Sequence, residues 1–213
     1  MRECSKAVQR RLNQANFISR YFIGDGIDIG GKPDPLIAYR ELFPGMRNVI
    51  TWDLEDGDAQ YLESIENEKL NFVHSSHCLE HLIDPYCGLK NWFRVLKHGG
   101  HMVITVPDED LYEQGVFPSR FNSDHKWTFT ILKQKSWSQK SINIFDLLSY
   151  LGDEAEVLKV ELINSNYRYA LPLYDQTLTA IGESSIEFII RKRTIKEVEM
   201  YGLRQNKQVI DKS

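Results

Sequence analysis

The sequence contains Gly26-Ile27-Asp28-Ile29-Gly30-Gly31, a short apolar strand that ends in a carboxylate and a glycine turn. Val49-Ile50-Thr51-Trp52-Asp53 follows as a second strand, and it also ends in a carboxylate. Further on, Phe72-Val73-His74-Ser75-Ser76-His77 is a strand that breaks into a polar loop. Strand ends that carry polar groups in βαβ order predict the mouth of a nucleotide-binding pocket.

Strands and helices alternate along most of the chain. The pattern predicts strands over 26–29, 48–52, 71–74, 101–106, 156–163 and 185–193, and helices over 5–21, 37–43, 59–67, 85–97 and 142–151. Elements of this length in this order are typical of an α/β fold. We expect a Rossmann-like, doubly wound and mostly parallel sheet with helices on both faces, and an antiparallel hairpin made by the last two strands.

The composition is that of one globular domain of 213 residues, with 42% hydrophobic and 26% charged residues. The net charge of -4 gives no footprint for nucleic-acid binding. The N-terminus lacks the apolar run of a signal peptide, and no apolar run is long enough to span a membrane. Cys4, Cys78 and Cys87 form no disulfide framework, which predicts a cytoplasmic protein.

Two acidic residues complete the predicted pocket. Asp53 lies about 25 residues after Asp28, where a carboxylate can accept hydrogen bonds from both ribose hydroxyls. Asp58, in the following loop, either presents a carboxylate to an adenine amino group or caps the next helix. Lys32 and Pro33 stand where the dinucleotide fingerprint needs glycines, which argues against an NAD site.

Four motifs in this order resemble those of class I S-adenosylmethionine-dependent methyltransferases. The resemblance rests on residues 26–31, 52–53, 72–85 and 94–107, and it covers roughly residues 22–110. It implies S-adenosyl-L-methionine as cofactor and a seven-stranded sheet whose last hairpin is reversed. The sequence departs from the family pattern at Lys32, where many members have a further glycine.

The resemblance also implies roles for particular residues. Asp28 and Gly30 would border the methionine half of the cofactor, Asp53 would hold the ribose, and Asp58 would hold the adenine amino group. Ser75, Ser76 and His77 would line the pocket floor near the transferred methyl group. The whole set expected to bind the cofactor is Asp28, Gly30, Gly31, Asp53, Leu54, Asp58, Ala59, Ser75, Ser76 and His77.

Methyl transfer to a hydroxyl requires removal of its proton, and a histidine suits that step near neutral pH. His77 and His125 are the two candidates, and Asp124 is close enough in sequence to orient His125. Asp108, Tyr112 and His125 are expected to bind the acceptor, because the segment that follows the fourth parallel strand lies at the pocket mouth. Glu113, in the same segment, is expected to be solvated.

These inferences define a single domain over residues 1–193. It comprises an N-terminal helix (1–22), a cofactor-binding half (22–107), an acceptor-site insertion (108–140) and a C-terminal helix and hairpin (141–193), followed by a charged tail (194–213). The expected activity is methyl transfer to an oxygen or nitrogen of a small molecule or glycan, with neither nucleic acid nor membrane as partner. The oligomeric state is left open.

Two alternatives remain open from the sequence. His77-Cys78-Leu79-Glu80-His81 matches H-x-x-E-H, which on a helix would bind Zn²⁺ with Glu80 as the base of a hydrolase. Its context argues against this reading, because any helix before Asp84-Pro85 is barely two turns long, and the favoured prediction includes no metal. The altered glycine loop suggests the second alternative, a methyltransferase-like binding module without catalysis.

Overall fold

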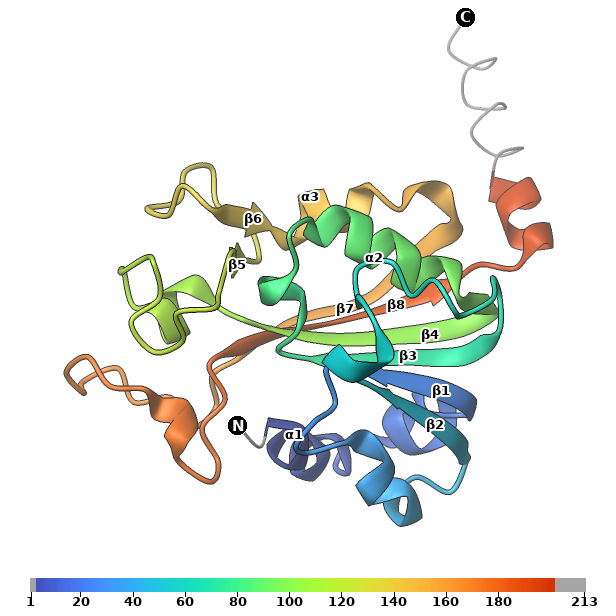
Figure 1. The fold of residues 1–213 in the computed structure, drawn as a ribbon, viewed down its shortest axis with the longest axis horizontal. Helices are drawn as coiled ribbons and strands as arrows, with labels where there is room; N and C mark the ends of the chain where they lie inside the picture. Colours follow the sequence, from blue (N-terminus) through green and yellow to red (C-terminus); the bar gives the residue numbers. More distant parts are fainter. Residues whose placement is uncertain (1–2, 202–213) are drawn as a thin grey trace, which may run out of the picture.

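The computed structural model describes residues 3–201, which form a central mixed sheet (Figure 1). In this part of the chain, six strands pair in the order β2-β1-β3-β4-β8-β7. Their bounds are Gly24–Ile29 (β1), Met46–Trp52 (β2), Leu70–Ser76 (β3), Leu96–Pro107 (β4), Ala155–Ile163 (β7) and Ser185–Lys192 (β8). Strands β1 to β4 are parallel, and β8 runs antiparallel to both of its neighbours. The predicted Rossmann-like sheet with a C-terminal antiparallel hairpin is confirmed.

The expected seventh strand of this sheet is not found among residues 3–201. Strand β2 is the edge, and the chain between Trp52 and Leu70 adds no strand beside it. A separate parallel ribbon is formed by β5 (Thr128–Thr130) and β6 (Ser141–Asn143). The seven-stranded sheet is therefore a wrong expectation, and the described chain ends its sheet one strand earlier on the β2 side.

Helices cover both faces of the sheet. Figure 1 shows α2 (Pro85–Arg94) and α3 (Ile144–Ser149) over one face, while α1 (Glu3–Arg11) crosses the other. Helix α2 begins after Asp84, whose carboxylate accepts hydrogen bonds from the backbone N–H groups of Tyr86 and Cys87. The helix expected over 142–151 begins later, because residues 141–143 extend as β6.

The helix expected over 5–21 is broken in the structure. Helix α1 ends at Arg11, and a π-helical segment, Phe17–Tyr21, follows after a turn. This break lets Phe17 and Phe22 pack beneath the sheet against Phe72, and all three side chains are fully buried. Aromatic packing outweighs helix continuity here, since a buried Phe contributes about 1.5–3 kcal/mol relative to an exposed one.

The helix expected over 59–67 does not form. The backbone makes a single turn after Asp58, and Leu62 then adopts a left-handed conformation with φ of 47°. Carbonyl groups that a helix would use accept hydrogen bonds from side chains of α2 instead. Trp92 Nε1 binds the carbonyl of Ala59 at 2.8 Å, and Arg94 binds those of residues 61, 62 and 65. Tertiary contacts therefore replace the local helix.

Two hydrophobic clusters fill the space above and below the sheet. Alternate residues of each inner strand belong to opposite clusters, as Phe72 and Val73 do on β3. The larger cluster joins the sheet to α2 and α3, and the smaller one joins it to the N-terminal segments. Burial on both faces explains why the inner strands read as almost continuous apolar runs.

The remaining segments surround one end of the sheet. Residues 108–140 contain a π-helical segment, Glu109–Glu113, and strand β5. Of the charged tail expected over 194–213, residues 195–201 are helical and the rest lies outside the described residues. Among the described residues, no helix has both the length and the apolar character that crossing a bilayer requires.

Candidate cofactor and acceptor site

Two adjoining pockets open where the parallel strands end. Register aligns these ends, because Ile29 of β1 lies beside Trp52 of β2 and Ser75 of β3. The larger pocket has a volume of about 710 Å³ and the smaller one of about 190 Å³. The residues that line both are Gly30, Lys32, His77 and His81. The position matches the rule that ligands of open α/β sheets bind outside the carboxyl ends of the strands.

The glycine turn after β1 forms the floor between the pockets. Gly30 has φ of +72°, and a Cβ there would lie 2.7 Å from the Cβ of Cys78. A Cβ on Gly31 would lie 2.5 Å from Oδ2 of Asp28. The turn therefore requires glycine at both positions for its own packing. Because neither residue has a side chain, the pocket space beside the turn stays open.

Asp28 lies behind this turn, at the buried edge of the smaller pocket. Its side chain is buried, Oδ2 accepts a hydrogen bond from the backbone N–H of Leu36 at 2.7 Å, and Oδ1 lies 2.6 Å from Nδ1 of His74. Arg11 donates to Nε2 of His74 at 2.9 Å, so the proton of this imidazole is on Nδ1 and points to Asp28. Both carboxylate oxygens are thus used to hold the turn.

The acids expected to hold the nucleoside line the larger pocket. Asp53 accepts hydrogen bonds from the backbone N–H groups of Leu54 and Lys32, at 2.8 and 3.1 Å, which fixes its carboxylate at the end of β2. Asp58 accepts from the backbone N–H of Gln60 at 2.8 Å and lies on the same wall. Asp58 thus closes a turn, and the helix that it was expected to cap is absent.

The rim of the larger pocket is apolar. Leu54 is 93% exposed and Ile83 is 76% exposed, and both line the opening together with Ala59. Exposed aliphatic side chains at a pocket mouth indicate a surface that a flat apolar ligand group would cover. Two carboxylates below an apolar rim suit a nucleoside, whose hydroxyl and amino groups donate hydrogen bonds while its base needs apolar walls. These acceptors and apolar walls therefore fit the adenosyl part of S-adenosylmethionine.

Two residues expected in the site lie outside both pockets. The Ser75 hydroxyl is buried and donates to the backbone carbonyl of Ile29 at 2.9 Å, so it joins β3 to β1. Asp108 is buried and caps the segment Glu109–Glu113, accepting from the backbone N–H groups of Asp110 and Leu111. Burial raises the pKa of Asp108 to about 6. Both side chains support the site from behind.

His77 lies at the junction of the two pockets. Its backbone has φ of 56°, its Nδ1 lies 3.1 Å from the hydroxyl of Ser76, and its Nε2 lies 3.1 Å from that of Ser185. Burial lowers the pKa of His77 to about 3. The imidazole is therefore neutral at ordinary pH, and it is too weakly basic to remove a proton efficiently near pH 7.

His125 lines the smaller pocket with Tyr112, and its orientation was predicted incorrectly. Its Nδ1 lies 2.7 Å from Oε1 of Glu113, which is buried rather than solvated. Asp124 turns the other way, and its Oδ2 lies 2.8 Å from Nδ1 of His81. Sequence adjacency suggested Asp124 as the partner of His125, whereas the chain direction at this bend places Glu113 there.

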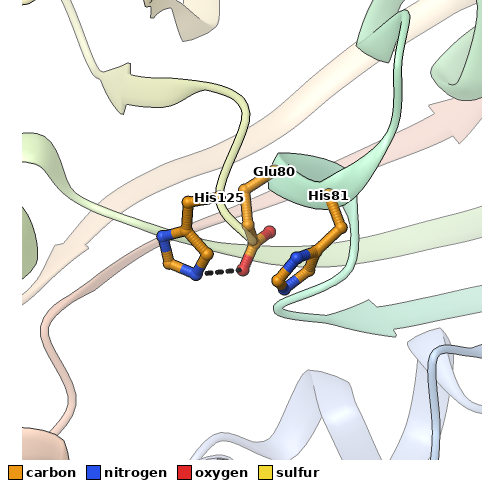
Figure 2. Close-up of side chains that lie close together, drawn as sticks. All are labelled: Glu80, His81 and His125. Atoms are coloured by element: carbon orange, nitrogen blue, oxygen red, sulfur yellow. Dashed lines mark ion pairs between the residues drawn. The ribbon is translucent and has the colours of Figure 1, made fainter. Parts of the chain in front are cut away.

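The H-x-x-E-H sequence does not form the zinc site that it suggested. Only Leu79–His81 is helical, a single 3-10 turn, and His77 lies outside it with its own hydroxyl partners. Instead, Glu80 and His81 lie close to His125, which belongs to the distant segment before β5 (Figure 2). No spacing in the sequence indicates that His125 would join them.

Several lining residues were missed from the sequence. The smaller pocket also includes Glu3, Cys4, Asp34 and Asn122, and the larger one includes Gln60 and Lys126. Glu3 and Cys4 come from α1, which folds back across the sheet, so no local pattern could have revealed them. Burial raises the pKa of Glu3 to about 7.

The comparisons with known proteins identify the family of this chain. The sequence matches the family described as a methyltransferase domain over residues 9–147, more than half of the chain. The chain belongs to this family, and it is an S-adenosylmethionine-dependent methyltransferase. This assignment leaves the zinc hydrolase and the non-catalytic module without support. Among curated proteins, the search found no match to the sequence.

Solved structures show the same fold at low sequence identity. An S-adenosylmethionine-dependent methyltransferase from Archaeoglobus fulgidus is 17% identical, with 90% of this chain and 95% of that chain covered and a TM-score of 0.54. One from Clostridium acetobutylicum is 13% identical, with 91% and 93% covered and a TM-score of 0.55. The 1,6-didemethyltoxoflavin-N1-methyltransferase from Burkholderia thailandensis is 11% identical, with 91% and 78% covered and a TM-score of 0.52.

Proposed function

We propose that this methyltransferase acts on an oxygen or nitrogen of a small molecule or a glycan. The observation that carries the proposal is the pair of pockets joined at four shared residues, one of nucleoside size and one of about 190 Å³. The narrow second pocket suits a small reacting group better than a macromolecular surface. The net charge of -4 also disfavours a nucleic-acid acceptor.

The residues that would hold the cofactor follow from the lining of the larger pocket. Asp53 would accept hydrogen bonds from ribose hydroxyls, Asp58 would accept from the adenine amino group, and Leu54 and Ala59 would cover the base. Gly30 and Gly31 would leave room for the methionine half. The bound cofactor supplies a methyl group already activated on a sulfonium sulfur.

The acceptor would enter the smaller pocket beside Tyr112. This hydroxyl is buried and has no hydrogen-bond partner within residues 3–201, so it is available to an acceptor. Its ring packs 5.2 Å from that of His125, which fixes its position. His77, neutral and held by two hydroxyls, would orient groups at the junction rather than act as a base. The chain's role is to bind, align and exclude water.

Calorimetric titration with S-adenosylhomocysteine tests the cofactor part of the proposal. The wild type should bind one molecule, and Asp53→Ala should weaken binding at least about tenfold, since hydrogen bonds to a charged group contribute about 1.5–3 kcal/mol. Asp25→Ala is the matched control, because Asp25 is an acid at the opposite end of β1, paired with Arg47. Equal affinity of wild type and Asp53→Ala would contradict the assignment.

The acceptor class is tested by a panel of phenols, amines and oligosaccharides with labelled methyl donor. A small-molecule or glycan product, together with no labelling of RNA, is the expected result. We also propose that the protein is cytoplasmic, because its three cysteines are free, as is usual in a reducing compartment.

A further inference from the structure

Three metal-binding side chains converge beside the smaller pocket, and the proposed function uses none of them as a set. Glu80 and His81 come from the 3-10 turn Leu79–His81, and His125 comes from the segment before β5. One ligand atom from each lies within 4.8 Å of the other two. Figure 2 shows both imidazoles directed toward the Glu80 carboxylate.

The Glu80 carboxylate lacks the partners that its burial requires. Its side chain is 0% exposed, and across the described residues neither oxygen accepts a hydrogen bond. Nε2 of His125 lies 3.9 Å from Oε1, too far for a hydrogen bond. An unpaired buried carboxylate costs several kcal/mol, so a group of this kind indicates a cation that completes the site.

The two imidazoles are already oriented as metal ligands. Nδ1 of His81 lies 2.8 Å from a carboxylate oxygen of Asp124, and Nδ1 of His125 lies 2.7 Å from one of Glu113. A carboxylate only accepts, so both Nδ1 atoms donate and each Nε2 of a neutral ring keeps its lone pair. Histidines that bind metals characteristically donate their other N–H to a carboxylate in this way.

We propose that Glu80, His81 and His125 bind one divalent transition-metal ion. Two imidazoles and one carboxylate favour Zn²⁺, Mn²⁺, Fe²⁺ or Co²⁺ over Mg²⁺ and Ca²⁺, which prefer oxygen ligands alone. Bond lengths of about 2.0–2.2 Å require the three donor atoms to move closer together, and rotation of the half-buried His81 side chain can supply most of that movement.

The site is next to the proposed chemistry without depending on it. His81 and His125 line the smaller pocket, and His81 also lines the larger one. Coordination positions that the protein leaves open would therefore face the shared space. Binding of the metal alone requires neither the cofactor nor the acceptor.

The test is a titration of untagged full-length protein, stripped of metal by dialysis against a chelator, with Co²⁺ and Zn²⁺. Wild type should bind one ion per chain, with visible d–d absorption for Co²⁺ and a higher Tm with Zn²⁺. Glu80→Gln and His81→Gln should each weaken binding by at least about 100-fold, because each removes a direct ligand. Since Glu80 lacks hydrogen bonds, Glu80→Gln should not lower the Tm of the metal-free protein.

His98→Gln is the matched control, because His98 pairs with Glu68 elsewhere on the surface. It should bind the ion as wild type does. Circular dichroism on each variant separates lost binding from lost folding. His81→Gln is the variant that should disturb the fold least, because the His81 side chain is only half-buried. No stoichiometric binding by wild type, or equal binding by wild type and Glu80→Gln, would overturn the proposal. Either result would leave S-adenosylhomocysteine binding to the larger pocket unaffected.

Discussion

Asp108 shows how a buried cap makes stability depend on pH. Its folded pKa of about 6 exceeds the ordinary value of 3.8, because burial disfavours the charged form. The folded state therefore binds the proton more tightly than the unfolded state does. Stability contributed by this group is complete below pH 3.8 and is lost as pH rises through about 6.

We expect Asp108→Asn to be more stable than wild type at pH 8 and equal to it at pH 4. The amide oxygen still accepts from Asp110 and Leu111, whereas the charge is gone. The shift from 3.8 to about 6 corresponds to a gain of about 3 kcal/mol at pH 8, measured by urea unfolding at both pH values. Asp84→Asn, at the exposed cap of α2, should give no gain. An equal gain in stability for Asp108→Asn and Asp84→Asn would show that burial of Asp108 is not the cause.

The sequence predicted which residues follow the strand ends better than it predicted the contacts between their side chains. Asp53, Leu54, Asp58 and Ala59 directly follow a strand, and strand register fixed their place on the pocket wall. The partners of the histidines depend on segments that meet only in the folded chain. Glu113 and Glu80 reach His125 across 12 and 45 residues, a relationship that no local spacing encodes.

Among the predicted elements, the main error was the helix expected over residues 59–67, between β2 and β3. Buried strands were predictable, because residues packed on both faces leave long apolar runs, as in β4. Residues 59–67 have helical spacing of apolar positions. However, their backbone carbonyls accept hydrogen bonds from the side chains of Trp92 and Arg94 on α2 instead of from a helix. Tertiary hydrogen bonds outweigh helix propensity, which amounts to a few tenths of a kcal/mol per residue.

Arg94 should therefore stabilise this segment strongly. Its guanidinium donates to the carbonyls of residues 61, 62 and 65, and to the side chain of Asn67. Lysine cannot span these acceptors, so Arg94→Lys should lower the free energy of unfolding by about 2 kcal/mol. Amide hydrogen exchange within 59–67 should become faster, as seen by mass spectrometry.

The control for this prediction is Lys90→Ala, one turn earlier on α2. Lys90 is exposed, and its ammonium lies over the ring of Tyr150 rather than on the segment. It should change stability by less than about 1 kcal/mol and leave exchange within 59–67 unaltered. Equal exchange in wild type and Arg94→Lys would show that apolar packing alone holds the segment.

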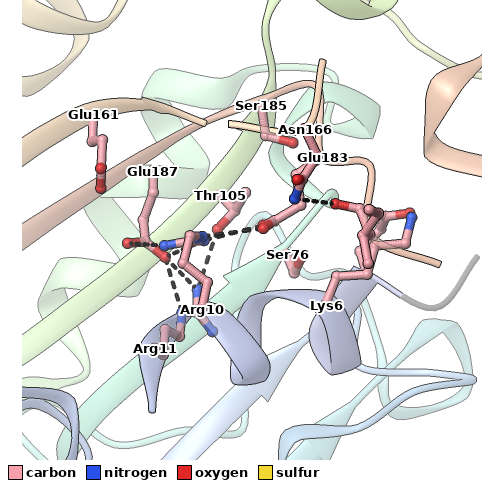
Figure 3. A network of polar contacts seen from close by, with 12 residues as sticks. Lys6, Arg10, Arg11, Ser76, Thr105, Glu161, Asn166, Glu183, Ser185 and Glu187 are labelled. Carbon is pink, nitrogen blue, oxygen red and sulfur yellow. Dashed lines mark hydrogen bonds and ion pairs between the residues drawn. The ribbon is translucent and has the colours of Figure 1, made fainter. Parts of the chain in front are cut away.

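The N-terminal helix is joined to its face of the sheet by charge as well as by packing. Figure 3 shows Arg10 and Arg11 of α1 directed at Glu187 of β8, the strand that lies between β4 and β7. Arg11 also donates to His74, whose other nitrogen binds Asp28 behind the glycine turn. A continuous chain of polar contacts thus runs from the N-terminal helix to the glycine turn between the two pockets, so α1 helps to hold that turn in place.

Glu187 holds this arrangement together and should dominate its acid stability. Burial alone would raise its pKa, but Arg11, Arg10 and Lys159 hold it well below the usual range. Its stabilisation is therefore complete above pH 4.5 and is lost as pH falls below that value. Glu187→Gln leaves buried cations unpaired and should lower the free energy of unfolding by about 3 kcal/mol at pH 7, with a smaller difference at pH 3. Glu66→Gln, which removes an exposed pair with Lys69, should cost less than about 1 kcal/mol. Urea titrations of both variants decide the matter, because a similar loss in the two would mean that the buried network contributes no more than a surface ion pair.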